Sequence, residues 1–289
     1  MMQQMQCTPQ MRTGLVFSGV EIGYRQKKIF TDFSIPETIR HGQITALLGP
    51  NGCGKSTLMK GVAGLIKMHG QVLLNGEDIT RLSMKERTKK IVYMPQTLPE
   101  AVHLRVFETV MVAANASVSG RYDGRLSAAG HGGESDLMKQ TQKQKMDEAY
   151  ALLEQLGIAH LAMSYISQLS GGQRQMVALA QALIRNPEVL LLDEPLSALD
   201  LNFQVHVMNL VREVTQQRHM VTVIVLHDIN IALRETDEIL LLSPGQFYAQ
   251  GLPAEVITPR VLAQVYGVRA RVETCSLGRA QVMIDGLAD

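Results

Sequence analysis

Cysteine is scarce in this sequence of 289 residues. The three cysteines, Cys7, Cys53 and Cys275, are far apart, and none belongs to a CxxC pair. An odd, scattered set argues against both a disulfide framework and a cysteine-ligated zinc site. We therefore expect the protein to work in a reducing compartment.

Long apolar runs are also missing. The longest, at 189–192 and 221–226, have the length of buried strands, whereas a membrane-spanning helix needs about 20 residues. Residues 1–13 have neither the basic start nor the apolar stretch of a secretory signal. We expect that the chain does not cross a membrane by itself, although it can dock onto a protein that does.

An excess of one charge is absent too. Lys plus Arg is 28 and Asp plus Glu is 27, so the formal net charge is +1. This balance argues against a strongly basic nucleic-acid-binding protein. Hydrophobic residues make up 46% and charged residues 19%, which is typical of a globular chain. The length suffices for one large domain with a smaller subdomain attached.

What the sequence does contain is a set of short apolar strands, several of which alternate with helical patterns. The strand candidates lie at 44–48, 91–93, 189–192, 221–226 and 239–242. This alternation predicts an α/β fold, with a mostly parallel sheet covered by helices on both faces. The β-rich start, 14–45, predicts an antiparallel N-terminal part.

A helical block interrupts this pattern and defines the predicted domains. We expect an α/β core over 14–96 and 169–250, divided by a helical subdomain over 97–168. The best helical segments of that subdomain are 106–114 and 145–156, and the polar, Gly/Ser-rich stretch 117–144 between them reads as a loop.

The two ends of the chain give weaker signals. Residues 1–13 are a Met/Gln-rich tail with little periodicity, and 251–289 form a short C-terminal extension. Within that extension the pattern predicts a helix over 254–265, followed by a β-rich tail.

The strongest motif follows the strand 44–48 and matches the phosphate-loop pattern G-x-x-x-x-G-K-[ST] in full. Its candidate nucleotide-binding residues are Gly49, Pro50, Asn51, Gly52, Cys53, Gly54, Lys55, Ser56 and Thr57. Glycines let backbone N–H groups wrap phosphate oxygens, and the helix start adds the positive end of a dipole. Lys55 can reach the β- and γ-phosphates, and the Ser56 hydroxyl can hold Mg²⁺. The alternative is a chance Gly-rich turn.

Two adjacent acids, Asp193 and Glu194, end the apolar strand 189–192. Carboxylates at the end of a buried strand need a compensating partner, because unpaired buried charge is costly. Asp193 is suited to holding Mg²⁺, and Glu194 to polarising the attacking water. The alternative is that these acids only cap the next helix.

Residues 169–173, Leu-Ser-Gly-Gly-Gln, stand just before a helical pattern and resemble the signature motif of ABC-type ATPases. Other landmarks of that family follow in its order, and the resemblance covers roughly 15–272. Tyr24 resembles the aromatic residue that stacks on adenine. Gln96 resembles the glutamine that links Mg²⁺ and the nucleophilic water to the permease. His227 resembles the histidine at the γ-phosphate, and Asp200 belongs to a loop that resembles the one crossing the dimer interface.

The resemblance implies a P-loop NTPase core of the RecA-like kind, with ATP and Mg²⁺ as cofactors. The implied catalytic residues are Glu194, His227, Gln96 and Lys55, and the implied metal-binding residues are Ser56, Gln96 and Asp193. Further nucleotide contacts are implied for Tyr24, Ser170, Gly171, Gly172, Gln173 and Asp200. In the family, the signature closes over the γ-phosphate that a second copy of the chain holds.

The implied partners are that second copy, a polytopic membrane permease and, indirectly, a periplasmic or extracellular substrate-binding protein, with no direct nucleic acid. The implied location is peripheral, on the cytoplasmic face of the membrane. Residues 251–258, 265–268 and 226–230, together with Cys53, are similar to ATPases of iron–siderophore, haem and cobalamin importers. Two alternatives stay open: an ABC-type ATPase with a regulatory or nucleic-acid-associated role, and a P-loop phosphotransferase.

Overall fold

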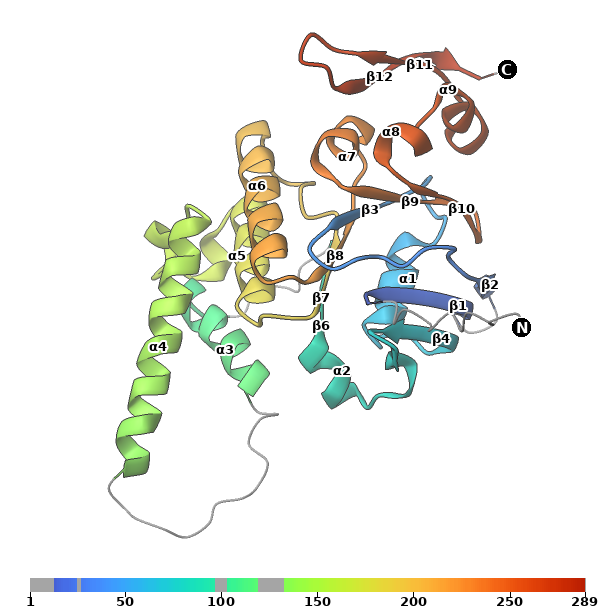
Figure 1. Ribbon diagram of the computed structural model, residues 1–289. Coiled ribbons are helices and arrows are strands. Elements are labelled where there is room, and N and C mark those ends of the chain that lie inside the picture. Colours follow the sequence, from blue (N-terminus) through green and yellow to red (C-terminus); the bar gives the residue numbers. More distant parts are fainter. Residues whose placement is uncertain (1–12, 25–26, 97–102, 119–132, 289) are drawn as a thin grey trace, which may run out of the picture.

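The computed structural model describes residues 13–24, 27–96, 103–118 and 133–288 (Figure 1). A six-stranded sheet forms the centre of the described chain. In spatial order its strands are β10 (Gln246–Gly251), β9 (Glu238–Ser243), β3 (Ile44–Leu48), β8 (Val221–Val225), β7 (Val189–Asp193) and β6 (Ile91–Met94). Neighbouring strands run parallel except β10, which pairs antiparallel with β9. The mostly parallel α/β sheet predicted from the sequence is therefore confirmed.

The inner strands are buried along their whole length, which explains why they read as continuous apolar runs. One face packs against helices that include α5 (Gly171–Leu183), α6 (Leu201–Gln217) and α7 (Ile229–Glu235). The other face packs against α1 (Lys55–Val62) together with a second sheet. Helices therefore cover both faces, as expected, and the second sheet lies beside α1 on this face.

The second sheet is antiparallel, as the N-terminal pattern predicts. In spatial order its strands are β2 (Lys27–Phe33), β1 (Leu15–Tyr24), β4 (Met68–Leu74) and β5 (Glu77–Asp78). Burial of Leu15, Phe17, Val20 and Ile22 in β1 places an apolar side against the core. Alternation of buried and more exposed residues along a strand is typical of a sheet with one covered face. The turn η1 (Ile79–Arg81) and helix α2 (Met84–Lys90) then lead into β6.

The helical block contains α3 (Val106–Val118), α4 (Gly133–Gln155) and the short 3₁₀ turns η2 (Ala159–Leu161) and η3 (Ile166–Gln168). The predicted loop over 117–144 is wrong at both of its described ends. Residues 133–144 belong to α4, and α3 extends through 118, while 119–132 lie outside the described residues. The stretch 140–144 is exposed, and it is rich in Gln and Lys, which favour helices. Its polarity therefore indicated that the segment faces solvent, and not that it forms a loop.

The C-terminal extension folds against the α7 end of the molecule. The expected continuous helix over 254–265 is wrong, because Pro259 starts a separate turn: α8 (Pro253–Val256), α9 (Pro259–Val261) and the π-helical turn η4 (Leu262–Tyr266) follow one another. A hairpin of β11 (Val268–Thr274) and β12 (Ala280–Leu287) ends the described chain, as the β-rich pattern indicated. Over the described ranges, none of the helices has the length and apolar character that a bilayer crossing requires.

Candidate nucleotide-binding and hydrolysis site

The phosphate loop connects the buried strand β3 to helix α1. Gly54 caps α1 with φ at 111°, in the left-handed region, and no side chain caps this helix start. A Cβ at Gly54 would lie 2.6 Å from side-chain atoms of Ile29 and Phe30, so close packing also requires glycine. At Gly52, by contrast, a Cβ would have no neighbour within 4 Å, so this side of the loop is open. The loop therefore has an open side on which backbone N–H groups can face a ligand, as a phosphate cradle needs.

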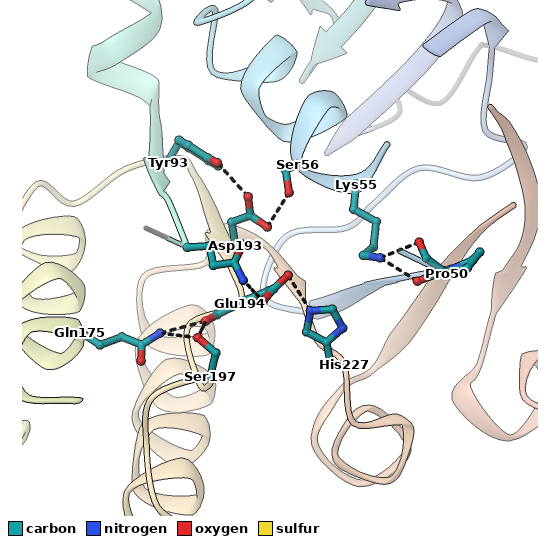
Figure 2. Close-up of polar contacts among 11 residues, drawn as sticks. Pro50, Lys55, Ser56, Tyr93, Gln175, Asp193, Glu194, Ser197 and His227 are labelled. Carbon is teal, nitrogen blue, oxygen red and sulfur yellow. Dashed lines mark hydrogen bonds and ion pairs between the residues drawn. The ribbon is translucent and has the colours of Figure 1, made fainter. Parts of the chain in front are cut away.

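Lys55 lies buried inside this loop. Its Nζ donates to the carbonyl oxygens of Gly49, at 2.7 Å, and Pro50, at 3.1 Å (Figure 2). These carbonyls hold the ammonium at the loop where phosphate oxygens would be bound. Cys53 is also buried, and burial raises the pKa of its thiol. Its sulfur is thus an inert part of the loop rather than a reactive group.

Asp193 ends β7 and is almost completely buried. Its Oδ1 accepts from the Ser56 hydroxyl at 3.1 Å, and its Oδ2 accepts from the Tyr93 hydroxyl at 2.8 Å; Figure 2 shows the two groups reaching the carboxylate. Burial, followed by the bond to Asp193, raises the pKa of Tyr93 far above its usual range, so the phenol stays a donor. Tyr93 was not among the site residues expected from the sequence.

The pair of Ser56 and Asp193 fits Mg²⁺ in its donor chemistry. Mg²⁺ takes oxygen ligands and is commonly held by one or two protein groups together with substrate phosphates and water. A group of three or more His, Cys, Asp or Glu side chains able to hold a metal is absent from the described residues, so a complete protein cage is not offered there. Gln96, the third expected metal ligand, is instead directed to Glu194.

Glu194 follows Asp193 and gathers the other predicted catalytic residues. Its Oε1 lies 2.5 Å from His227 Nε2 (Figure 2). Its Oε2 accepts from the side-chain amide of Gln96. Its φ is 54°, which a glutamate adopts only when the surrounding structure imposes it. Helix α6 is capped by Asp200, which accepts from the Phe203 amide at 3.0 Å, and not by either strand-end acid. The capping alternative for Asp193 and Glu194 is therefore wrong.

Gln175, which the sequence analysis missed, connects this cluster to α5. Its side chain is buried, with Nε2 donating to the Glu194 carbonyl at 2.8 Å and Oε1 accepting from the Ala198 amide at 3.1 Å. Ser197 Oγ donates to the same carbonyl at 3.1 Å. Gln175 lies on the helix that begins at Ser170, so these hydrogen bonds join α5 to the Glu194 turn. Only its position five residues after Ser170 could have indicated a site residue.

The predicted signature residues form the N-terminus of α5. Ser170 Oγ accepts from the Gln173 amide at 3.3 Å, and Gln173 Oε1 accepts from the Ser170 amide at 2.9 Å. A Cβ at Gly172 would lie 2.8 Å from the Ala198 carbonyl, so glycine lets the loop before Asp200 pack closely. Ser170 and Gly171 are exposed.

The signature lines a cavity of about 450 Å³, which also contacts Asp200, Phe203 and His160. None of its lining residues belongs to the phosphate loop, 49–57. Within the described residues, this cavity therefore contains only one of the two glycine-rich helix starts. Tyr24, expected beside adenine, ends β1 and is 47% exposed, which leaves its ring accessible.

Comparisons with known proteins agree with this geometry. A family model described as ABC transporter matches residues 34–197. The iron(3+)-hydroxamate import ATP-binding protein FhuC of Bacillus subtilis is 36% identical, covering 88% of this chain and 87% of that protein. The ferric enterobactin transport ATP-binding protein FepC of Escherichia coli is 31% identical, covering 87% of this chain and 86% of that protein.

Among solved structures, the dimeric post-hydrolysis state of an ATP-binding cassette bound to ADP and Pi is 26% identical, with a TM-score of 0.66, covering 83% of this chain and 98% of that chain. These relatives set aside the phosphotransferase alternative, and they lend no support to a regulatory or nucleic-acid-associated role. The sequence match, the fold and the arrangement of motifs lead to one conclusion: the chain belongs to the ABC transporter family, as an ATP-binding subunit that hydrolyses ATP.

Proposed function

We propose that this subunit hydrolyses Mg²⁺–ATP through the cluster around Glu194. Ser56 and Asp193 would hold Mg²⁺, which would supply charge neutralisation at the phosphates. Lys55 moves from its loop carbonyls to the β- and γ-phosphates, and Ser56 and Asp193 supply the protein's metal contacts. Glu194 accepts the proton of the attacking water, while His227 and Gln96 fix its carboxylate. Tyr24 supports the adenine ring.

The separation of the signature from the phosphate loop supports a shared site. A self-contained enzyme would gain nothing from a second glycine-rich helix start that opens on another cavity. In a dimer, Ser170–Gln173 of one copy would cover the γ-phosphate held by the other copy, with Asp200 at the interface. ATP would then close the dimer and hydrolysis would open it, which is the mechanical output.

We further propose that this output drives import of an iron chelate through a separate membrane permease. The names of FhuC and FepC, the iron(3+)-hydroxamate and ferric enterobactin relatives, support that substrate class. The C-terminal resemblance leaves haem and cobalamin as related substrates. The subunit would lie on the cytoplasmic face of the membrane and meet the substrate-binding protein only through the permease.

A mixture of two inactive variants tests the shared site. Lys55→Ala removes the phosphate contact, and Ser170→Arg places a bulky cation at the signature. Their heterodimer has one site with both halves intact and one with both broken. Crosslinking should detect ATP-dependent closure in the mixture beyond that of either variant alone. Proven heterodimers without such closure would contradict the shared site.

Transport requires a separate test in cells. The tagged subunit, purified from membranes of its own host, should bring down a polytopic permease that mass spectrometry identifies. Cells carrying Glu194→Gln should lose uptake of ⁵⁵Fe-labelled siderophore while making normal amounts of protein. Unchanged uptake of iron chelates, haem and cobalamin in these cells would contradict import of this class.

A further inference from the structure

The C-terminal hairpin of β11 and β12 is not used by the chemistry described above, yet it is docked on the core. Figure 1 shows it at one end of the molecule, beyond α7. Ala270 and Val282 on its inner side are 6% and 7% exposed, and both join the core cluster that contains Ile231 and Ala232 of α7. The hairpin is thus packed on the helix that follows His227.

One side chain makes a specific connection there. Asn230 Nδ2 donates to the Val282 carbonyl at 3.2 Å, and the Val282 amide donates to Asn230 Oδ1 at 2.7 Å. The side-chain amide thereby pairs with one peptide group of β12 in both directions, as a neighbouring strand would. Because the Asn230 side-chain amide both donates and accepts here, the two bonds hold β12 next to the first turn of α7.

That first turn also fixes where His227 lies. Asp228 caps α7 by accepting from the amides of Asn230, at 2.7 Å, and Ile231, at 3.2 Å. His227 immediately precedes this cap, and its side chain is 50% exposed, so few neighbours other than Glu194 restrain it. A contact that holds the start of α7 therefore also holds the backbone from which the imidazole reaches Glu194.

A second part of the extension is also packed on the core. Tyr266, at the end of η4, is packed against the core. Burial raises the pKa of Tyr266 to about 12, so the phenol stays protonated at neutral pH. The extension is thus joined to the core through both the hairpin and η4.

We propose that Asn230 is a positioning residue, through which the C-terminal hairpin holds His227 against Glu194. The claim rests on the proposed hydrolytic role of that cluster. It gives the motif 226–230 a physical meaning: the histidine holds the Glu194 carboxylate, and the asparagine three residues later anchors its loop to β12. The extension then serves turnover as well as stability.

Replacement of Asn230 by Leu tests this, because Leu has a similar volume but cannot pair with Val282. We expect kcat to fall about 10- to 100-fold, the range associated with small misplacement of a reacting group, while KM for ATP changes little. Gln217→Leu is the matched control: Gln217 is exposed on α6 and bonds to the exposed Glu213, away from the site, so its loss should leave kcat unchanged.

A double-mutant cycle separates positioning from general stability. If Asn230 acts through His227, then Asn230→Leu should have no further effect in a His227→Ala background. An equal loss of kcat in both backgrounds would overturn the proposal. A global decline in stability would appear as a lower Tm, which is measured for all variants.

Hydrogen exchange provides a readout that does not depend on turnover. In nucleotide-free Asn230→Leu protein, amides of 227–231 and the Val282 amide should exchange faster, with the rest of the core unchanged. Faster exchange at Val282 alone, with normal protection at 227–231 and normal kcat, would overturn the proposal. If wild-type protein shows no ATPase activity, the proposed function fails instead, while the exchange pattern still reports on the contact.

Discussion

Two helices of this molecule begin with a glycine-rich turn, and they are built in opposite ways. Helix α1 starts at Gly54, has no side-chain cap, and carries a buried Lys55. Helix α5 starts at Ser170, whose hydroxyl and backbone amide are both paired with Gln173. A helix start without a side-chain cap leaves N–H groups that need an external acceptor, whereas a capping box satisfies two of them internally.

This difference assigns different roles to the two helix starts. The α1 start needs a ligand to complete its hydrogen bonding, so it is suited to holding phosphate within one subunit. The α5 start is already stable and exposed. This fits the proposed contact with a phosphate that another subunit holds. Gln175 connects the second start to the Glu194 carbonyl, which in the proposed mechanism joins the signature to the hydrolytic cluster.

The largest effect is expected from Glu194→Gln, which should stop hydrolysis but not ATP binding. Binding of ATP at the α1 start and dimer closure at the α5 start can then be measured separately. Loss of the general base should lower kcat about 10²- to 10⁴-fold, while ATP still binds and the dimer stays closed. Phosphate release and gel filtration with ATP measure the two effects. Glu188→Gln, at an exposed glutamate just before β7, is the control. Turnover near wild type would remove Glu194 from the proposed mechanism.

Lys55→Ala tests the α1 start directly. The lost charge-assisted contacts are worth about 1.5–3 kcal/mol, so we expect the Kd for ATP to rise about 10- to 100-fold. Titration with a fluorescent ATP analogue measures this, and Lys60→Ala in the same helix is the control. Normal affinity would mean that the nucleotide is held elsewhere.

Much of this site could be predicted because its information is local. The phosphate loop, the acids after a buried strand and the signature are each defined by spacing within a few residues. The apolar runs of β3, β7 and β8 likewise predict a sheet buried on both faces. The clustering of Gln96, Glu194 and His227 follows from the family resemblance, and their contacts appear in the structure.

The remaining features depend on contacts between distant segments or on shape alone. Tyr93 reaches Asp193 across 100 positions of sequence, and Val282 meets Asn230 across 52. Neither pairing leaves a periodic signal. The helical state of 133–144 was missed for another reason: polar side chains report that a segment faces water, and a helix can face water too.

Tyr93→Phe should have a smaller effect, on the proposed Mg²⁺ site that Ser56 of α1 forms with Asp193. Removing the hydroxyl leaves Asp193 with Ser56 as its only side-chain donor in the described structure. We expect the affinity for ATP in the presence of Mg²⁺ to fall about 2- to 10-fold. This is the range for one hydrogen bond of about 0.5–1.5 kcal/mol. Nucleotide titrations at several Mg²⁺ concentrations measure it. Tyr248→Phe, which removes a phenol bonded to Gln264, is the matched control.

Ser170→Arg should scarcely change nucleotide affinity in the monomer. The substitution lies at an exposed helix start outside the phosphate loop, so we expect the Kd for ATP to change no more than about twofold. In a Glu194→Gln background, however, ATP should no longer produce the closed dimer on gel filtration. A large loss of monomer affinity would contradict the separation between the two starts.

The smallest effect concerns the sulfur inside the α1 start. Burial raises the pKa of Cys53, whereas backbone N–H groups of Arg279 and Leu277 lower the pKa of Cys275. Because the thiolate is the reactive form, iodoacetamide at neutral pH should label Cys275 well before Cys53, as peptide mass spectrometry can show. Cys53→Ser should keep kcat within about threefold, since the loop holds phosphate through backbone N–H groups, which serine retains. A folded Cys53→Ser protein without turnover would show that the α1 start depends on this side chain as well as on its backbone.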